Sequence, residues 1–427
     1  MYKKVTPPTV VIPDPVVLAL PLSKSLSNRL LIINALAGQP THPSLVANCD
    51  DTRAMIEALA TTGDCEINVG AAGTAMRFLT AYFATRPYRS VTIDGTERMR
   101  QRPIGPLVDA LRQLGADIRY LGREGYPPLL IKGQQLEGGG VSVDAGISSQ
   151  YTSALLMVGP CMKLGLELML KGSIVSRPYI DMTLRMMNRR NAFITERETA
   201  QDVHEIRLAP RLYHIDNSGS PVEADWSAAL YWYEVAALTG QSFILRGLSA
   251  GSLQGDSRVK SVFLELGVKT DFLPEGGVKV YASGMPDDSV LEVDLTECPD
   301  AAQTVAATCC GLGKRFIIKG LSTLPLKETD RLAAMKKELA KLGYDIEIIG
   351  NDTLRWMGKR LEVSPEPIVE TYHDHRMAMS LAPLSVVAGQ IMVDDPQVVS
   401  KSYPDFWDDL AMAGFTLADV AENENSL

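Results

Sequence analysis

Two series of predicted helices recur along the chain at a spacing of about 75 residues. Helices of the first series begin with polar side chains and run into small apolar residues, near Ser25, Thr74, Ser148, Asp225, Asp300 and Asp374. Helices of the second series are amphipathic, and four end close to a glycine, as helix C-caps often do, at 55–59, 107–111, 183–187, 261–266, 335–339 and 406–410. The spacing predicts one α/β unit used six times, the first shortened. Chance similarity among ordinary α/β units is the alternative.

Length and composition set further limits on the class of protein. A chain of 427 residues, 46% of them hydrophobic, can bury a large core and should form at least two domains. Its net charge of −9 argues against a nucleic-acid-binding surface. Six cysteines without a C-x-x-C pair favour the reducing cytoplasm. The apolar run 16–22 is too short to span a bilayer, so no membrane association is expected.

Three short segments place cationic and hydroxyl side chains at predicted helix starts: 22–29, 70–77 and 327–331. Helix starts carry unpaired N–H groups and the positive end of the helix dipole, so they bind anions. Each segment alone has an ordinary explanation, such as a solvated helix end or a tight turn. Together they predict a site for a substrate with several negative charges.

The first two segments predict closely spaced anion contacts. In the first, Lys24 precedes a helix over 25–37, and Ser25 and Arg29 share one face of it. In the second, Gly73 lets the backbone approach a ligand closely, while Thr74 and Arg77 lie one turn apart. The second segment is not a Walker A loop, because the Gly-Lys-Thr/Ser ending is absent.

The third segment adds a candidate proton-transfer group. Lys327 and Arg331 are four residues apart, with Glu328 between them, although a solvated charged helix start is the usual meaning of such a run. Asp300 opens another predicted helix, either as an N-cap or as a general base. Near the end of the chain, the segment 373–376 resembles a metal cluster, but its spacing matches no zinc motif, so we expect Arg376 to contact an anion and no metal to bind.

With these residues assembled, the chain resembles the 5-enolpyruvylshikimate-3-phosphate synthases of the enolpyruvyl transferase family. The resemblance covers nearly the whole chain, and the motifs occur in family order: Ser-Lys-Ser-x-Ser-Asn-Arg at 23–29, Ala-Gly-Thr-Ala-Met-Arg at 72–77, Arg-Pro-Ile at 102–104, Ser-Ser-Gln at 148–150, Ser-Arg-Pro-Tyr-Ile at 176–180, Pro-Asp-Ala-Ala at 299–302, Lys-Glu-Thr-Asp-Arg at 327–331, Asp-His-Arg-Met-Ala-Met at 374–379 and Lys-Ser-Tyr-Pro-Asp at 401–405.

The resemblance implies an α/β fold of two domains, each built from three units of helices and strands, with the active site in the interdomain cleft. One domain would span residues 23–222, and the other would combine 1–22 with 223–427, so that the chain crosses twice. The polar stretch 216–220 is the best linker candidate.

The resemblance also implies a reaction, in which the enolpyruvyl group of phosphoenolpyruvate passes to the 5-hydroxyl of shikimate 3-phosphate and phosphate is released. This step belongs to the shikimate pathway toward chorismate and the aromatic amino acids. The implied partners are these two anionic substrates, with no cofactor, no nucleic acid and no membrane, and the family precedent is a monomer.

Residue roles follow from the same resemblance. Shikimate 3-phosphate would contact Lys24, Ser25, Arg29, Ser148, Ser149, Gln150, Ser176, Asp300 and Lys327. Phosphoenolpyruvate would contact Lys24, Gly73, Thr74, Arg77, Arg102, Arg331, Arg376 and Lys401. Asp300 would accept the proton of the attacking hydroxyl, while Glu328 and Lys24 would handle protons at the methylene carbon and the leaving phosphate.

Three departures from the family pattern stand out. Ala71 replaces an asparagine beside the phosphoenolpyruvate contacts, Trp226 replaces a small residue in the segment 224–227, and Leu22 stands where glycine is frequent. Two rivals follow. One is the sister enzyme acting on UDP-N-acetylglucosamine, but the loop 95–101 lacks its reactive cysteine. The other is a binding protein without turnover, against which the intact Lys24, Asp300 and Glu328 argue.

Overall fold

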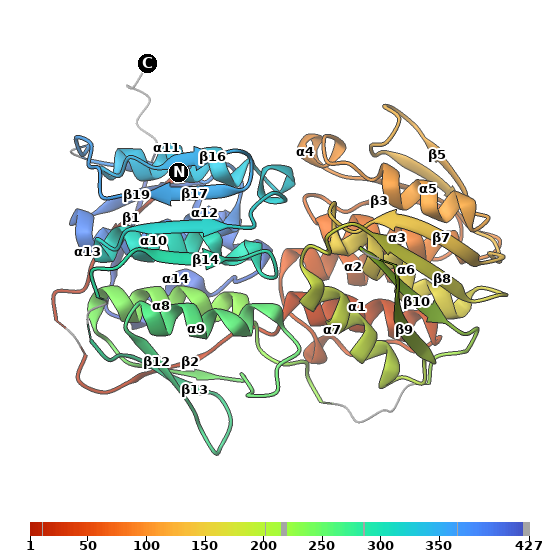
Figure 1. The fold of residues 1–427 in the computed structure, drawn as a ribbon, viewed down its shortest axis with the longest axis horizontal. Coiled ribbons are helices and arrows are strands. Elements are labelled where there is room, and N and C mark those ends of the chain that lie inside the picture. The colour runs from red at the N-terminus through yellow and green to blue at the C-terminus, as the bar shows by residue number, and fades with distance from the viewer. Residues whose placement is uncertain (11, 201, 215–219, 285–286, 365, 422–427) are drawn as a thin grey trace. The chain divides into compact units, whose positions relative to one another are not determined.

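The computed structural model describes residues 1–10, 12–200, 202–214, 220–284, 287–364 and 366–421. The chain divides into two compact units. Unit 1 combines Met1–Pro21 with Glu223–Leu427, and unit 2 comprises Leu22–Val222 (Figure 1). The predicted linker 216–220 lies, apart from Ser220, outside the described residues. Throughout the described ranges, none of the helices has the length and apolar character needed to cross a membrane.

Unit 1 contains three four-stranded sheets within its described residues, in the orders β2-β11-β13-β12, β14-β15-β17-β16 and β18-β19-β1-β20. Their strands are β1 (Tyr2–Thr6), β2 (Val16–Ala19), β11 (Phe243–Arg246), β12 (Val268–Phe272), β13 (Val278–Ala282), β14 (Leu291–Asp294), β15 (Phe316–Lys319), β16 (Glu347–Ile349), β17 (Thr353–Trp356), β18 (Ile368–Val369), β19 (Ile391–Asp394) and β20 (Thr416–Val420). The helices of the unit are α8 (Trp226–Thr239), η3 (Gly255–Arg258), α9 (Val259–Glu265), η4 (Pro299–Ala301), α10 (Ala302–Leu312), η5 (Leu324–Leu326), α11 (Arg331–Lys341), α12 (His375–Leu381), η6 (Ala382–Leu384), α13 (Ser385–Ala388), η7 (Pro396–Lys401) and α14 (Phe406–Met412).

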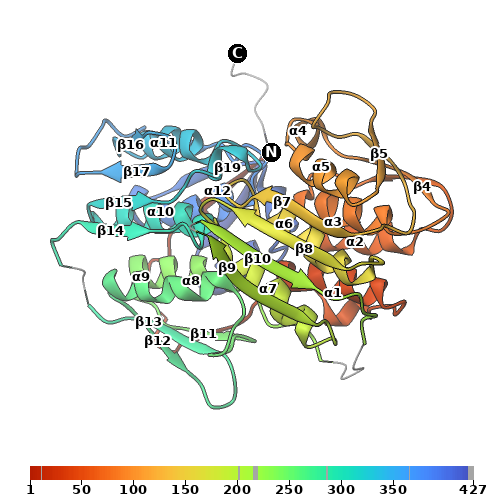
Figure 2. The ribbon, with the colours of Figure 1, turned by 45° about the vertical axis from the view of Figure 1, so that its right-hand side comes forward.

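Unit 2 contains two such sheets among its described residues, in the orders β3-β4-β6-β5 and β7-β8-β10-β9, the second visible in Figure 2. Their strands are β3 (Cys65–Asn68), β4 (Ser90–Asp94), β5 (Asp117–Tyr120), β6 (Leu129–Lys132), β7 (Gly139–Asp144), β8 (Leu166–Lys171), β9 (Ile194–Ala200) and β10 (Val203–Leu208). The helices are α1 (Lys24–Leu36), η1 (Pro43–Leu45), α2 (Asp50–Ala60), α3 (Gly73–Ala84), α4 (Glu97–Arg100), α5 (Gly105–Gln113), α6 (Ser149–Val158), η2 (Gly159–Cys161) and α7 (Arg177–Asn188).

Four of the sheets share one topology, with a parallel pair followed by two antiparallel pairings in the order first, second, fourth, third strand. The fifth sheet keeps the same pattern, except that the N-terminal strand β1 replaces the fourth strand of the unit. It lies between β19 and β20. Between residues 24 and 64, all of them described, there are helices and no strand. The predicted repeat, with a shortened first unit, is therefore confirmed.

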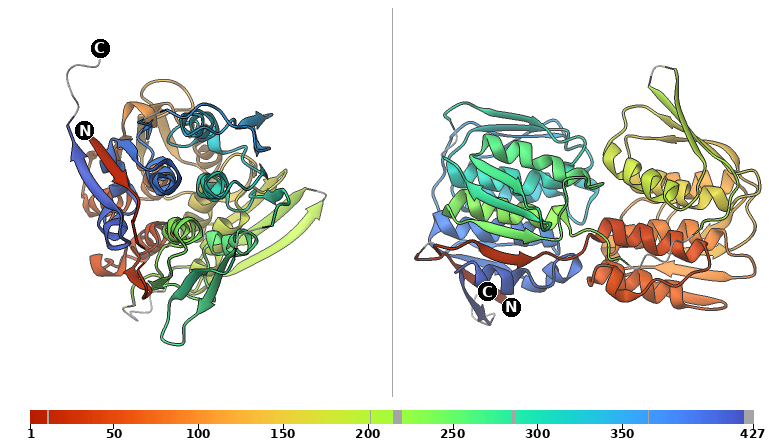
Figure 3. Two further views of the ribbon diagram at one scale, coloured as in Figure 1. Left: turned by 90° about the vertical axis from the view of Figure 1, so that its left-hand side faces the viewer. Right: turned by 90° about the horizontal axis from the view of Figure 1, so that it is seen from below.

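Three nearly fully buried helices form the core of each unit. In unit 1 these are α8, α10 and α12, which pack against one another and are seen nearly end-on in green, teal and blue in the left panel of Figure 3. In unit 2 they are α1, α3 and α6. Their buried side chains, large aromatic ones as well as alanines, pack helix against helix. The amphipathic helices of the second series and the sheets cover them. These six helices are the first series predicted from the sequence.

The helix ends follow the capping chemistry of the sequence. Ser23, Ser148, Asp225 and Asp374 accept hydrogen bonds from backbone N–H groups at the starts of α1, α6, α8 and α12. The predicted C-cap glycines Gly115, Gly267, Gly343 and Gly414 all have positive φ. Two predicted starts are wrong. Helix α1 begins at Lys24, not after it, and α11 begins at Arg331 with Asp330 as its N-cap, so Lys327 and Glu328 precede the helix.

Candidate active site

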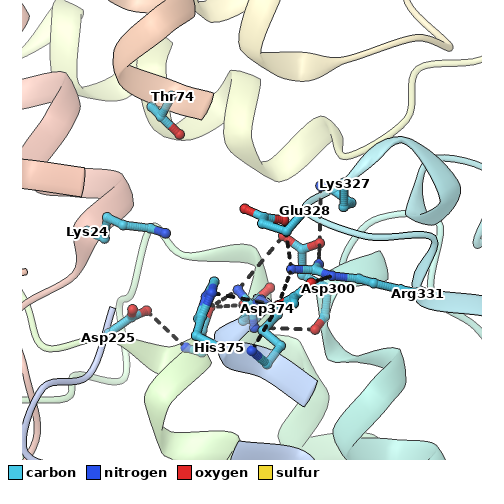
Figure 4. A network of polar contacts seen from close by, with 12 residues as sticks. Lys24, Thr74, Asp225, Asp300, Lys327, Glu328, Arg331, Asp374 and His375 are labelled. Atoms are coloured by element: carbon cyan, nitrogen blue, oxygen red, sulfur yellow. Dashed lines mark hydrogen bonds and ion pairs between the residues drawn. The ribbon is translucent and has the colours of Figure 1, made fainter. Parts of the chain in front are cut away.

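The charged residues predicted in unit 1 form one cluster around Arg331, whose exposed fraction is only 1%. Its Nε donates to Asp374 Oδ2 at 2.7 Å, its Nη1 to Asp300 Oδ1 at 2.8 Å, and its Nη2 to Glu328 Oε2 at 3.1 Å. Figure 4 shows these side chains pointing toward the guanidinium. The alternative of a solvated charged helix start does not hold for this run, because Arg331 is enclosed by carboxylates.

Asp300 lies among cations. Lys327 Nζ is 3.1 Å from its Oδ1, and Arg376 donates to its backbone carbonyl at 3.3 Å, with Nη2 3.8 Å from Oδ2. Burial by itself would raise the pKa of the Asp300 carboxyl, but Lys327, Arg376 and Arg331 together hold that pKa well below its usual range. Asp300 lies in η4 and its carboxylate contacts these cations, so of the two predicted roles the N-cap is wrong.

Glu328 joins the cluster to a further cation. Lys401 Nζ is 2.9 Å from Glu328 Oε1, while Glu328 Oε2 accepts from Arg331. Lys401 is contributed by the end of η7, more than 70 residues along the chain from Glu328. Four cations and three carboxylates from four separate segments therefore meet in unit 1, a density of charge that a fold buries only when the groups satisfy one another.

In unit 2, the start of α1 holds two of the predicted cations. Lys24 Nζ is 3.1 Å from Asp51 Oδ2, and Asp51, on α2, is 3% exposed. Arg29 is also buried, but it is held by neutral oxygens. Its Nε donates to Thr183 Oγ1 at 2.7 Å, and its Nη2 to Ser153 Oγ at 3.1 Å.

Two backbone carbonyls complete the contacts of Arg29. Its Nη1 donates to the carbonyl of Ser25 at 2.9 Å, and its Nη2 to the carbonyl of Tyr179 at 3.2 Å. Burial lowers the pKa of Arg29 to about 10. The side chain stays charged at neutral pH, with its positive charge solvated by dipoles rather than cancelled by an anion.

The starts of α3 and α6 are joined by a side-chain hydrogen bond, in which Gln150 Nε2 donates to Thr74 Oγ1 at 3.3 Å. Gly73 lies beside them, and a Cβ at this position would lie 2.6 Å from Arg102 Nη1, so a larger residue here would displace the end of the Arg102 side chain. Arg77 donates to the carbonyl of Gly73 at 3.1 Å and to that of Pro103 at 2.9 Å. The predicted residues Gly73, Thr74 and Gln150 therefore lie at the starts of α3 and α6. The guanidinium groups of Arg77 and Arg102 lie close to Gly73.

The predicted serines of unit 2 occupy special backbone positions. Ser148 caps α6 by accepting from the N–H of Gln150, and Ser149 is the first residue of that helix. Ser176 precedes α7 with a φ of 56°, a left-handed conformation that is uncommon for a residue other than glycine. The structure holds Ser176 in this conformation with its side chain mostly buried.

The sequence prediction missed several residues that hold the predicted ones in place, namely Asp51, Ser153, Thr183, Ser227, Asp256 and Asp374. Asp374 was predicted at a helix start and considered as a possible metal ligand, and in the structure it both caps α12 and accepts from Arg331. Its contact with Arg331 was not predicted. No position at a helix start marks Thr183, which lies in the interior of α7, 154 residues from Arg29.

Within the described parts of the chain, no three His, Cys, Asp or Glu side chains are grouped as metal ligands would be. His373 pairs with Asp395 at 2.7 Å, and Asp374 is engaged by Arg331. Arg376 lies against Asp300 and Ser227, among the other charged groups of the cluster.

The comparisons with known proteins identify the family of the chain. Residues 60–410 match the family model for EPSP synthase (3-phosphoshikimate 1-carboxyvinyltransferase). The chain belongs to the EPSP synthase family. A 3-phosphoshikimate 1-carboxyvinyltransferase of Bacteroides fragilis is 49% identical over 397 residues, covering 93% of this chain and 94% of that protein. One from Haemophilus influenzae is 34% identical over 417 residues, covering 91% and 94%. The prediction that the chain is an enzyme of this family is confirmed.

Solved structures support the fold of this EPSP synthase family member. An EPSP synthase from Acinetobacter baumannii superposes with a TM-score of 0.70 at 20% sequence identity, covering 99% of this chain and all of the other. A second structure of EPSP synthase from the same organism gives a TM-score of 0.69. The predicted α/β enolpyruvyl transferase fold is therefore confirmed.

Proposed function

We propose that the chain transfers the enolpyruvyl group of phosphoenolpyruvate to the 5-hydroxyl of shikimate 3-phosphate, releasing phosphate. Family membership supports the reaction, and the names of the relatives favour it over transfer to UDP-N-acetylglucosamine. The observation that carries the proposal for this chain is the placement of the Asp300 and Glu328 carboxylates among Lys327, Arg331, Arg376 and Lys401. That combination can neutralise anionic substrates and move protons at one place.

The chemistry requires both kinds of group. Protonation of the phosphoenolpyruvate methylene carbon makes the neighbouring carbon cationic. The 5-hydroxyl attacks that carbon while a carboxylate, Asp300, accepts its proton. The C–O bond to phosphate then breaks, and a proton is removed from the new methyl group, restoring the double bond. We assign the proton transfers at carbon and at the leaving phosphate to Glu328 and Lys24.

Cations that bind the substrates stabilise the charge of the tetrahedral adduct. Fixed guanidinium and ammonium groups need no reorientation during the reaction, so they stabilise the transition state more than water does. For shikimate 3-phosphate we propose Ser25, Arg29, Ser148, Ser149, Gln150, Ser176 and Lys327. For phosphoenolpyruvate we propose Gly73, Thr74, Arg77, Arg102, Arg331, Arg376 and Lys401.

The low pKa of Asp300 has a mechanistic consequence. A carboxylate surrounded by three cations is a weak base, because protonating it removes three favourable ion pairs. Substrate phosphate and carboxylate groups would compete for Lys327 and Arg376 and so raise the pKa of Asp300. We propose that Asp300 becomes an effective base only when the anionic substrates are bound.

A direct test is to measure phosphate release from purified protein with both substrates, and with each substrate alone. We expect release only when both are present, together with formation of the enolpyruvyl ether. Tight binding of shikimate 3-phosphate without any turnover would instead support the binding-protein alternative. Turnover with UDP-N-acetylglucosamine as acceptor would support the sister activity.

We also propose that the enzyme is a cytoplasmic monomer that uses no metal or other cofactor and binds no nucleic acid. The net charge of −9 supports the last of these statements, and the cysteine pattern supports the compartment. Light scattering during size-exclusion chromatography would test the monomer, since a dimer would have twice the expected mass. Full activity after exhaustive treatment with a chelator would support a metal-free reaction.

A further inference from the structure

Arg376 is held away from the Asp300 carboxylate by a hydroxyl. Its Nη2 donates to Ser227 Oγ at 3.2 Å, whereas the same nitrogen is 3.8 Å from Asp300 Oδ2. A guanidinium group next to a carboxylate tends to form a closer, paired contact. Ser227 therefore competes with Asp300 for Arg376 and keeps the guanidinium from closing onto the carboxylate.

The orientation of the Ser227 hydroxyl is set by Asp256. Ser227 Oγ donates its proton to Asp256 Oδ2, in a short contact, and Asp256 is 2% exposed. A hydroxyl has one proton and two lone pairs, so donation to Asp256 leaves only lone pairs to face Arg376. The Asp256 carboxylate thus orients the Ser227 hydroxyl so that its oxygen can accept a hydrogen bond from the Arg376 guanidinium.

The segment that carries Asp256 is itself fixed to the start of α8. Gln254 Oε1 accepts from the N–H of Trp226 at 3.0 Å, and Gln254 Nε2 donates to the carbonyl of Ala224 at 2.7 Å. Glu223 accepts from the indole of Trp226 at 3.0 Å and from the hydroxyl of Ser252 at 2.6 Å. Trp226, an unusual residue for this position, is 1% exposed and takes part in this network.

From these contacts we propose that Ser227 and Asp256 are positioning residues for Arg376, which set the affinity of the enzyme for phosphoenolpyruvate. The proposal rests on the proposed function, because it assigns Arg376 to that substrate. Without the Asp256–Ser227 pair, Arg376 would close onto Asp300 and would have to be pulled away again when phosphoenolpyruvate binds. The effect should fall on one substrate only.

The experiment measures steady-state kinetics of Ser227→Ala and Asp256→Ala, after the wild-type protein has been shown to release phosphate. Absence of wild-type turnover would refute the proposed function rather than this inference. We expect the KM for phosphoenolpyruvate to rise about 10- to 100-fold, as loss of a hydrogen bond to a charged group does, and kcat to fall by less than about threefold. The Kd for shikimate 3-phosphate alone should be unchanged.

Three further variants separate positioning from a general structural effect. Ser227→Thr keeps the hydroxyl and should restore the KM to within about threefold of the wild type. Ser261→Ala removes an exposed hydroxyl of α9 and should change nothing. In an Arg376→Ala background, Asp256→Ala should add less than about a twofold change, because the residue through which Asp256 acts is gone.

Either of two results obtained with Asp256→Ala overturns the inference. One is an undiminished effect of Asp256→Ala in the Arg376→Ala background. The other is an equal loss of affinity for both substrates. If Asp256→Ala does not fold, as judged by its thermal melting, Asp256→Asn serves in its place, since the amide preserves the shape of the side chain and removes its charge. An unchanged KM in a folded Asp256→Asn protein together with an unchanged KM in Ser227→Ala would also overturn it.

Discussion

The two units hold buried arginines in opposite ways. In unit 1, Arg331 is enclosed by Asp300, Glu328 and Asp374. In unit 2, Arg29 is enclosed by hydroxyl and carbonyl oxygens, and its pKa is lowered to about 10 by burial. A cation surrounded by carboxylates is neutralised, whereas one surrounded by neutral dipoles retains its attraction for an anion.

The difference indicates a division of labour. The carboxylates that pair with the cations of unit 1 can also accept and donate protons, so we propose that this unit supplies acid–base groups beside its proposed phosphoenolpyruvate contacts. The uncancelled charge of Arg29 equips unit 2 for binding an anionic substrate, at some expense in stability, because a buried charge without a counter-ion is unfavourable. Lys24, paired with Asp51, is an exception in unit 2, in keeping with the proton-transfer role proposed for it.

The largest expected effect is on turnover, through the carboxylate at the centre of unit 1. Asp300→Ala should lower kcat by about 10²–10⁴-fold, the usual contribution of a general base, with binding of shikimate 3-phosphate retained. Stopped assays of phosphate release and a binding titration measure the two quantities. The matched control is Asp288→Ala, which removes a fully exposed carboxylate of the same unit. Undiminished turnover of Asp300→Ala would refute the assigned role.

A second prediction concerns stability and tests whether Arg331 compensates the charge of the carboxylates that surround it in unit 1. Arg331→Met leaves three buried or partly buried carboxylates without their shared cation, so the free energy of unfolding should fall by about 3–5 kcal/mol. Urea denaturation followed by circular dichroism measures it. Arg331→Lys, which keeps the charge, should lose less. Equal stability of Arg331→Met and the wild type would contradict the comparison between the units.

The corresponding change in unit 2 should cost less stability. Arg29→Met leaves only neutral oxygens unpaired, so we expect a loss of about 1–3 kcal/mol, together with an affinity for shikimate 3-phosphate reduced at least about tenfold. The same denaturation experiment and a binding titration measure both. Arg53→Met, which breaks an exposed pair with Asp50, is the control and should cost below about 1 kcal/mol. A stability loss as large as that of Arg331→Met would contradict the proposed difference between the buried arginines of the two units.

The last prediction concerns Glu234, a carboxyl in the core of unit 1 that lies outside the cluster. It is fully buried on α8, neither of its oxygens has a hydrogen-bond partner among the described residues, and burial raises its pKa well above the ordinary value. The stabilisation due to protonated Glu234 is fully present below the pKa of a glutamate in the unfolded chain, near 4.3. As the pH rises from there toward the pKa of Glu234 in the folded protein, the free energy of unfolding falls by at most about 1.4 kcal/mol per pH unit.

Glu234→Gln removes this titration, since the amide stays neutral. The stability of the wild type should therefore decline relative to that of the variant between pH 5 and pH 8. Parallel pH profiles of the unfolding midpoint for the two proteins would show that Glu234 is not neutral in the folded state.

Much of the fold and part of the site were predictable because their signals are local. Helix starts, capping serines and aspartates and C-cap glycines depend on neighbouring residues, so the repeat could be read from their spacing. The predicted start of α11 failed because Asp330 satisfies the first N–H groups of that helix, which therefore begins only at Arg331. The motifs also identified the cations and the two candidate proton-transfer groups of unit 1.

The sequence by itself therefore determined the repeated units, most of their helix starts and the charged residues that lie near them. Only the tertiary structure decided which charge neutralises which. Arg331 contacts Asp374 from 43 residues away, and Arg29 contacts Thr183 from 154 residues away. Ion pairing and desolvation depend on distance and burial in space, and neither quantity is encoded by spacing along the chain.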